Sequence, residues 1–238
     1  MFARLANPAR FMALSRPLAP AFGLAALALF AVGVPLALSA PDDYQQGATV
    51  RIMSVHVPAA ILGEAVYAVI GVCSFLGLVF RHALADAAAK AAAPLGAAFT
   101  ALALVTGSLW GKPTWGTWWV WDARLTSMLV LLLLYLGYMA LHAALDDEQR
   151  AARAAAILAL VGLVNLPIVK FSVDWWHSLH QGESLIRPGG PTVPPVYLIP
   201  LALMGLAYAC LFASLWLVRI RAEVWRRRAG ALALAAAG

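Results

Sequence analysis

The sequence predicts an all-α, polytopic membrane protein with six transmembrane helices. Hydrophobic residues make up 63% of the 238 residues and charged residues only 12%, whereas about a quarter of a soluble domain is charged. Apolar stretches of about twenty residues recur, and each is long enough to cross a bilayer as a helix. They are rich in Leu, Ala, Val and Gly and lack the alternating pattern of a barrel strand, which favours the helical class.

The six spans are expected to form a single membrane domain that covers residues 1–238. They lie at about 20–40, 58–80, 92–110, 125–141, 152–169 and 195–218. The first span follows an Arg-bearing start and ends in Ala-Leu-Ser, a pattern that cleaved signal peptides share. Its apolar part is longer than a usual signal core, so we expect a retained helix.

Basic residues are divided unequally between the two sides of these spans. With both termini in the cytoplasm, the cytoplasmic side holds twelve Lys and Arg residues and the outer side five. Cytoplasmic segments are enriched in Lys and Arg, so this orientation is the expected one. The net charge of +6 gathers at residues 219–228 and other cytoplasmic segments, where anionic headgroups account for it without a nucleic-acid partner. Cys73 and Cys210 fall inside spans without C-x-x-C spacing, which argues against thiol exchange.

The most distinctive segment is W-G-K-P-T-W-G-T-W-W-V-W-D at Trp110–Asp122, which holds five of the nine tryptophans. An interfacial belt spreads its tryptophans over both sides of a membrane, but seven of the nine lie in two outer segments. A helix would place on one face Trp115, Trp118, Trp119 and Asp122. An extended segment would instead align Trp115, Trp119 and Trp121. Both alternatives predict an aromatic surface that binds a flat apolar ligand.

Histidines flank this segment on the outer side. His56 precedes the second predicted span by two residues, and His177 and His180 lie in the connection before the last span. A planar metal complex needs a flat apolar platform and one or two axial imidazoles, and haem iron takes such ligands from histidine. Zinc needs three or four ligands in tetrahedral geometry, so H-S-L-H alone is a weak zinc pattern.

Charged side chains on the outer side fit a ligand that carries carboxylates. Arg51, Arg124 and Arg187 are candidates to pair with two propionates. Asp122 has three alternative roles: it orients a tryptophan N–H, pairs with Arg124, or caps the helix of the fourth span. Glu64 falls inside the second span, and an intramembrane acid is by default a functional residue, but the sequence names no partner for it.

Catalytic patterns are missing from the sequence. G-K-P-T at 111–114 resembles the end of a phosphate-binding loop but lacks the required earlier glycine, so we expect no ATPase activity in this chain. No hydrolase triad and no carboxylate pair suited to acid–base chemistry is recognisable. We therefore predict a binding or transfer component, not an enzyme, and assign no catalytic residue.

At Trp115–Asp122 the sequence W-G-T-W-W-V-W-D is similar to the W-G-x-x-W-x-W-D signature of a haem-handling membrane protein family, known for its WWD motif. V-H-V-P at His56 and W-W-H-S-L-H-Q-G at His180 resemble the branch of that family that serves cytochrome c maturation. The resemblance runs from about Arg51 to the last span. In the family one histidine precedes the second span and another precedes the last, which match His56 and His180, whereas His177 has no counterpart.

The resemblance implies a bacterial inner-membrane protein that binds haem b transiently at its periplasmic face and presents it to the haem chaperone CcmE. It also implies an ABC-type complex with CcmA, CcmB and the small membrane protein CcmD. In this hypothesis two histidines ligate the iron, the tryptophans of segment 110–124 hold the macrocycle, and arginines steer the propionates. The implied haem-binding residues are His56, His180, Trp115, Trp118, Trp119, Trp121, Asp122, Arg124 and Arg51.

Proteins of other classes share some of these features. A membrane haem-b electron-transfer subunit normally buries its histidines within the spans, whereas His56, His177 and His180 are predicted at or beyond the span ends. A structural subunit without haem would use the tryptophans as a protein interface, where Trp is a common hot spot. A cytochrome c synthetase of the same wider family would need more spans than this chain supplies.

Overall fold

The computed structural model describes residues 7–180, 182, 184–185 and 188–237, and its all-α class confirms the prediction. The described elements, in chain order, are α2 (Pro8–Leu38), the 3-10 helix η1 (Ala48–Ile52), α3 (Met53–Phe80), α4 (Ala83–Trp115), α5 (Ala123–Ala144), α6 (Glu148–Gly162), α7 (Asn165–Trp175) and α8 (Pro195–Ala237). The described residues contain no strand, only an isolated bridge between Asp43 and Gly47.

Six helical stretches are long and apolar enough to cross a membrane, as predicted. The helices extend beyond the predicted spans at several ends. α2 begins at Pro8, where the Asn7 side chain accepts the N–H of Ala9 at 2.9 Å. α4 continues to Trp115, and α8 continues to Ala237. Hydropathy locates the lipid-length part of a helix, but a helix ends only where capping groups replace its own hydrogen bonds.

The fifth span is broken between α6 and α7. Pro167 has no N–H to donate to the carbonyl of Leu163, so the regular helical pattern cannot continue through this point. The Leu166 N–H instead donates to Leu163 at 3.1 Å, which is a tighter turn. The buried Asn165 side chain donates from Nδ2 to the carbonyl of Ser127 at 2.9 Å and ties the break to α5.

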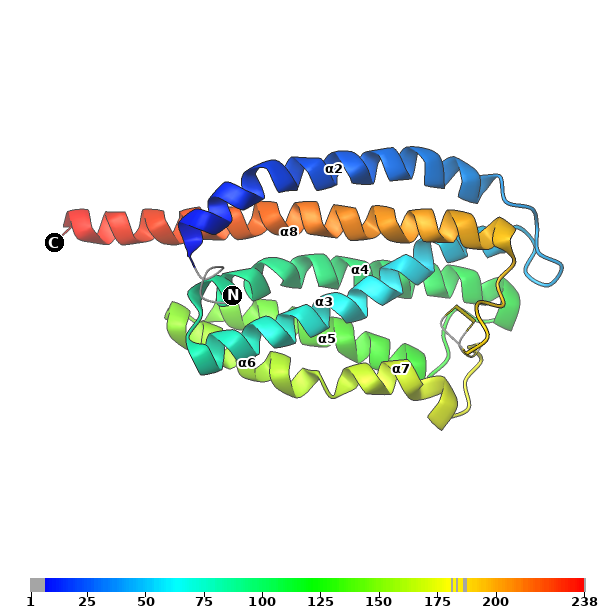
Figure 1. Ribbon diagram of the computed structural model, residues 1–238. Helices are drawn as coiled ribbons and strands as arrows, with labels where there is room; N and C mark the ends of the chain where they lie inside the picture. The colour runs from blue at the N-terminus through cyan, green and yellow to red at the C-terminus, as the bar shows by residue number, and fades with distance from the viewer. Residues whose placement is uncertain (1–6, 181, 183, 186–187, 238) are drawn as a thin grey trace.

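The six candidate spans run in alternating directions through one bundle, and α6 and α7 together form the fifth (Figure 1). α2 packs chiefly on α8, α8 packs on α3 and α4, and α5 packs on α4, α6 and α7. The connections 39–52 and 116–122 and the described residues of the connection 176–194 gather at one end of the bundle, which we call the tryptophan end (Figure 1). The start of α2 and the end of α8 lie at the opposite end (Figure 1).

Two buried tyrosines hold the centre of the bundle. Tyr67 and Tyr135 are both fully buried and meet edge to face with ring centroids 5.1 Å apart. Tyr135 donates its hydroxyl to the carbonyl of Gly63 at 2.7 Å. A Cβ atom at Gly96 would lie 2.2 Å from the Tyr135 oxygen, so only glycine allows α4 to approach this ring, as is common in membrane helix packing.

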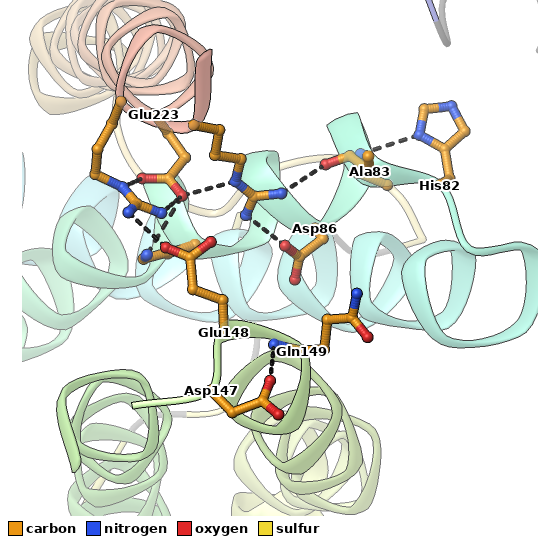
Figure 2. A network of polar contacts seen from close by, with 11 residues as sticks. His82, Ala83, Asp86, Asp147, Glu148, Gln149 and Glu223 are labelled. Atoms are coloured by element: carbon orange, nitrogen blue, oxygen red, sulfur yellow. Dashed lines mark hydrogen bonds and ion pairs between the residues drawn. The ribbon is translucent and has the colours of Figure 1, made fainter. Parts of the chain in front are cut away.

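Ion pairs connect the helices at the end of the bundle opposite the tryptophan end. Glu223 on α8 accepts hydrogen bonds from Arg226 and Arg227 of the same helix. Arg227 also donates to Asp86 on α4, and Arg226 donates to Glu148 at the start of α6 (Figure 2). These contacts join three helices that are far apart in the sequence. They involve none of the polar groups of the tryptophan end.

Candidate functional site

The tryptophan segment, residues 110–122, is helical as far as Trp115 and irregular after it. Gly116 ends α4 in a left-handed conformation (φ 75°), which glycine adopts without steric penalty. Its N–H donates to the carbonyl of Lys112 at 3.0 Å. Trp119 and Trp121 then meet edge to face with ring centroids 5.4 Å apart. The segment is therefore neither a continuous helix nor a continuous extended strand.

The tryptophans after Trp115 present aromatic surface at this end of the bundle. Trp118 and Trp121 are 53% and 76% exposed. The Lys112 ammonium lies 5.7 Å from the Trp118 ring centroid, a cation–π contact. The Nε1 atom of Trp119 is buried and has no hydrogen-bond acceptor among the described residues. These rings expose apolar aromatic faces at the tryptophan end, and the planes of Trp119 and Trp121 are inclined at 74° to each other.

His56 lies in the first turn of α3, which begins at Met53, ahead of the span predicted at 58–80. Its Nδ1 atom is 3.0 Å from the carbonyl oxygen of Ala103 on α4 and 3.2 Å from Thr106 Oγ1. A carbonyl oxygen only accepts, so Nδ1 carries the proton and Nε2 keeps its lone pair. The imidazole also meets the Trp110 ring edge to face, with centroids 5.6 Å apart. The local contacts thus fix the orientation and the tautomer of His56.

Two glycines on α4 make room for His56 and Trp115. A Cβ atom at Gly107 would lie 2.9 Å from His56 Cε1, and one at Gly111 would lie 2.7 Å from Trp115 Cε3. Ala103, Gly107 and Gly111 follow one another at intervals of four residues, so they line one face of the helix. Because this face carries only small residues, the rings of His56 and Trp115 can pack directly against the backbone of α4.

Asp122 joins the start of α5 to the connection before α8. Its Oδ1 accepts the N–H of Leu125 at 2.8 Å, which confirms the capping alternative. Its Oδ2 accepts the Ser178 hydroxyl and lies 3.3 Å from Nδ1 of His180. The predicted alternative of pairing with Arg124 is wrong, because Arg124 donates to the carbonyl of Lys170 at 3.4 Å. Asp122 thus holds His180 through its second oxygen.

Burial and hydrogen bonding set the charges of this pair. Burial alone would raise the pKa of Asp122, but hydrogen bonds from Ser178 and Leu125, with the nearby His180, hold it below its usual value. Burial lowers the pKa of His180, and the Asp122 carboxylate offsets this only in part. At neutral pH the aspartate is therefore ionised and the imidazole neutral, with its proton on Nδ1 and the Nε2 lone pair free.

The two histidines belong to one cluster. His180 meets the Trp115 ring edge to face with centroids 4.7 Å apart. His56 meets Trp110, which lies on α4 as Trp115 does, with ring centroids 5.6 Å apart. The structure therefore brings together five predicted site residues from α3, α4, α5 and the two connections: His56, Trp115, Asp122, Arg124 and His180.

Other predicted residues lie outside this cluster or are engaged elsewhere. Arg51 donates to the carbonyl of Ala40 at 2.9 Å and to the Asp42 carboxylate at 2.7 Å. Its guanidinium therefore stabilises the connection 39–52. Arg187 lies outside the described residues. His177 is exposed, three residues before His180. His177 is therefore the exposed histidine with which the two partly buried imidazoles, those of His56 and His180, can be compared.

Sequence reasoning missed several residues that position the cluster. Ser178 contacts both Asp122 and His180, and a serine two residues before a histidine is a short-range signal for such a turn. The glycines of α4 were also detectable, since small residues four apart mark a close-packed helix face. The hydrogen bond from Trp110 Nε1 to Gln46 at 2.8 Å had no sequence signal, because 64 residues separate its partners.

Six helical stretches long and apolar enough to cross a membrane, among the residues that the structure describes, define the class of a multi-pass helical membrane protein, here with histidines, tryptophans and an aspartate gathered at one end. The sequence model of a family described as heme exporter protein C matches residues 1–235. This chain belongs to that family, which confirms the resemblance found in the WWD motif.

Relatives named heme exporter protein C align over most of the chain. One from Bradyrhizobium diazoefficiens is 57% identical over 228 residues, which covers 96% of this chain and 87% of the relative. One from Escherichia coli K12 is 48% identical over 219 residues, with coverages of 92% and 88%. One from Paracoccus denitrificans is 44% identical over 228 residues, with coverages of 95% and 95%.

Proposed function

We propose that this protein binds haem at the tryptophan end and presents it to the periplasmic chaperone CcmE during cytochrome c maturation. The names of its relatives support a role in haem handling. The proposal places the tryptophan end at the periplasmic face of a bacterial inner membrane and both termini in the cytoplasm, which the distribution of basic residues favours. It also includes an ABC-type complex with CcmA, CcmB and CcmD.

One observation carries this proposal: both partly buried histidines use Nδ1 for a hydrogen bond and leave Nε2 available. His56 donates to the carbonyl of Ala103, and His180 lies beside the carboxylate of Asp122. Metal-binding histidines nearly always donate their other ring N–H to a carbonyl or carboxylate, which orients the ring and fixes its tautomer. These residues therefore suit axial ligation of haem iron.

The surrounding residues fit the rest of the haem molecule. Trp115 packs on His180, and Trp118, Trp119 and Trp121 would hold the apolar macrocycle by stacking. Arg124 has a buried Nε without an acceptor among the described residues, which suits a propionate. Arg51 would join the site only by exchanging its bond to Asp42, so Arg124 is the stronger propionate candidate of the two.

Transfer requires that haem b is held transiently. Trp118 and Trp121 are exposed, so a macrocycle resting on them keeps one edge open toward solvent and toward a partner protein. A site that buries its ligand completely would need to open before release. The protein is proposed to act as a presenting component, and energy from nucleotide hydrolysis would come from its partners.

Haem titration of the purified protein tests this function. Addition of haem should shift the Soret band, and the shift should be strongly reduced in His56→Ala and His180→Ala. His177→Ala is the matched control, because His177 is exposed and lies in the same connection as His180. Haem attached to the chaperone in cells should fall in the same order, at normal membrane levels of each variant. An unchanged Soret shift in the double variant of His56 and His180 would refute the ligand assignment.

A further inference from the structure

Trp110 contacts His56 but is not among the residues assigned to haem. The indole and the imidazole meet edge to face, with ring centroids 5.6 Å apart and planes inclined at 70°. The indole Nε1 donates to Oε1 of Gln46, in the connection 39–52, at 2.8 Å. An indole N–H only donates, so the oxygen of the Gln46 amide must face it. Trp110 therefore lies between His56 and the connection 39–52.

The hydrogen bonds of His56 hold one atom of its ring but not the plane of the ring. Its Nδ1 contacts the carbonyl of Ala103 and the hydroxyl of Thr106. A ring that is held at one nitrogen can still tilt about that atom, and a tilt moves the other nitrogen, Nε2. Ala103, Thr106 and Trp110 lie on one face of α4, since they are spaced three and four residues apart. The indole on this face limits the tilt of the imidazole.

Gln46 is fixed within the connection 39–52 by its own backbone. Its N–H donates to Oδ1 of Asp43 at 2.9 Å, and its carbonyl accepts the hydroxyl of Thr49 at 2.7 Å. Gly47 follows with a positive φ of 56° and pairs with Asp43 in an isolated bridge. Gln46 and Trp110 are both partly buried, so water competes less for the bond between them than it would at the surface. The turn therefore offers the indole a fixed acceptor.

We propose that Gln46 is a positioning residue that acts on His56 through the indole of Trp110. The hydrogen bond at Nε1 prevents the indole from turning about its side-chain bonds, and the fixed indole holds the plane of the imidazole. The inference rests on the proposed function in one respect, since it takes Nε2 of His56 to bind haem iron. The conformation of the connection 39–52 thereby determines where one iron ligand points.

Gln46→Leu tests this role, because it removes the acceptor and keeps a side chain of similar size. Haem affinity in a Soret titration should fall by about two- to tenfold, which is the effect of one neutral hydrogen bond. Gln45→Leu is the matched control. Gln45 is the neighbouring residue of the same type, its backbone N–H also donates to Asp43, and it is exposed. Haem affinity should not change in this control.

The position of the imidazole can also be measured without haem. NMR of the full chain in nanodiscs, with isotope-labelled histidine, detects the ring protons of His56, and their signals are assigned by their loss in His56→Ala. The adjacent indole shifts these signals through its ring current. They should move toward the values of a free imidazole in Gln46→Leu. They should stay in place in Gln46→Glu, which keeps an acceptor oxygen for Trp110, and a general loss of stability would not produce this pattern.

A double-substitution cycle determines whether Gln46 acts through Trp110. Trp110→Phe keeps an aromatic edge beside His56 and removes the N–H donor, so by itself it should lower haem affinity by a similar factor. In the Trp110→Phe background Gln46→Leu should have no further effect, because the hydrogen bond is already absent.

Several outcomes would overturn the inference. Wild-type haem affinity and unshifted His56 signals in Gln46→Leu would show that Gln46 does not position the ring. Equal losses in Gln45→Leu and Gln46→Leu, or additive losses in the double variant, would show the same. If Gln46→Leu does not fold, wild-type haem affinity in Trp110→Phe overturns the inference on its own. A wild type without a Soret shift refutes the proposed function instead, and the NMR comparison still tests the position of the imidazole.

Discussion

Asp122→Asn tests how strongly one carboxylate controls the histidine beside it. Asp122 uses Oδ1 to cap α5 at Leu125 and presents Oδ2 to Ser178 and His180. With its oxygen still on Leu125, the new amide would point its NH2 group at the protonated Nδ1 of His180. Two donors would then face each other, so His180 would move its proton to Nε2 or turn away. In either case Nε2 no longer offers its lone pair to iron.

The expected magnitudes separate binding from stability. Loss of an orienting partner typically lowers metal affinity by about tenfold to a hundredfold, so the haem affinity of Asp122→Asn should fall in that range. Asn caps helices about as well as Asp, but it loses the hydrogen bonds that the buried carboxylate accepts from Ser178 and His180, so folding stability should fall by about 1–3 kcal/mol. Asp122→Ala loses the cap as well and should cost about 1 kcal/mol more.

Two measurements on the same preparations decide the outcome. Soret titration gives the haem affinity, and thermal unfolding in the same detergent gives the stability. Asp122→Asn should lose affinity with a smaller loss of stability than Asp122→Ala, which loses the helix cap as well. Haem affinity of Asp122→Asn within twofold of the wild type, together with a clear loss in His180→Ala, would refute the reasoning.

Three further predictions follow from the same geometry. In Gly107→Ala the added Cβ would lie 2.9 Å from Cε1 of His56, so it should displace the ring and lower haem affinity by about tenfold in a Soret titration. Gly205→Ala is the control: a Cβ there meets open space, and haem affinity should not change. The pKa of His180 is lowered, so haem affinity should not change with pH above the ordinary histidine pKa of about 6.5. Affinity should fall only at lower pH, because protons then compete with iron for Nε2. A fall in affinity between pH 8 and 7 would contradict this. Tyr135→Phe removes a buried hydrogen bond and should lower the unfolding free energy by about 0.6–1.5 kcal/mol without changing haem affinity.

Short-range signals in the sequence predict part of the site correctly. Asp122 precedes an apolar stretch, so a helix cap was one of the three roles that the sequence left open, and the structure shows that cap at Leu125. Pro167 marks the break in the fifth span, although hydropathy alone counts that span as one helix. The position of His56 was less predictable, because α3 begins at Met53, ahead of the apolar stretch used to define the span. A helix can continue through polar residues at a membrane surface, and the hydropathy profile does not show this continuation.

The sequence by itself determined the helical class, the six spans and the family. Long apolar stretches form helices in lipid, because a helix satisfies its own backbone hydrogen bonds. The family can be recognised from the WWD motif, because that motif is a short run of neighbouring residues. Tertiary structure alone decided which partners hold the two histidines. His56 meets Ala103 across 47 residues and His180 meets Asp122 across 58. Such contacts depend on how closely α3 and α4 pack and on where the loops meet, and neither is encoded in the spacing of residues along the chain.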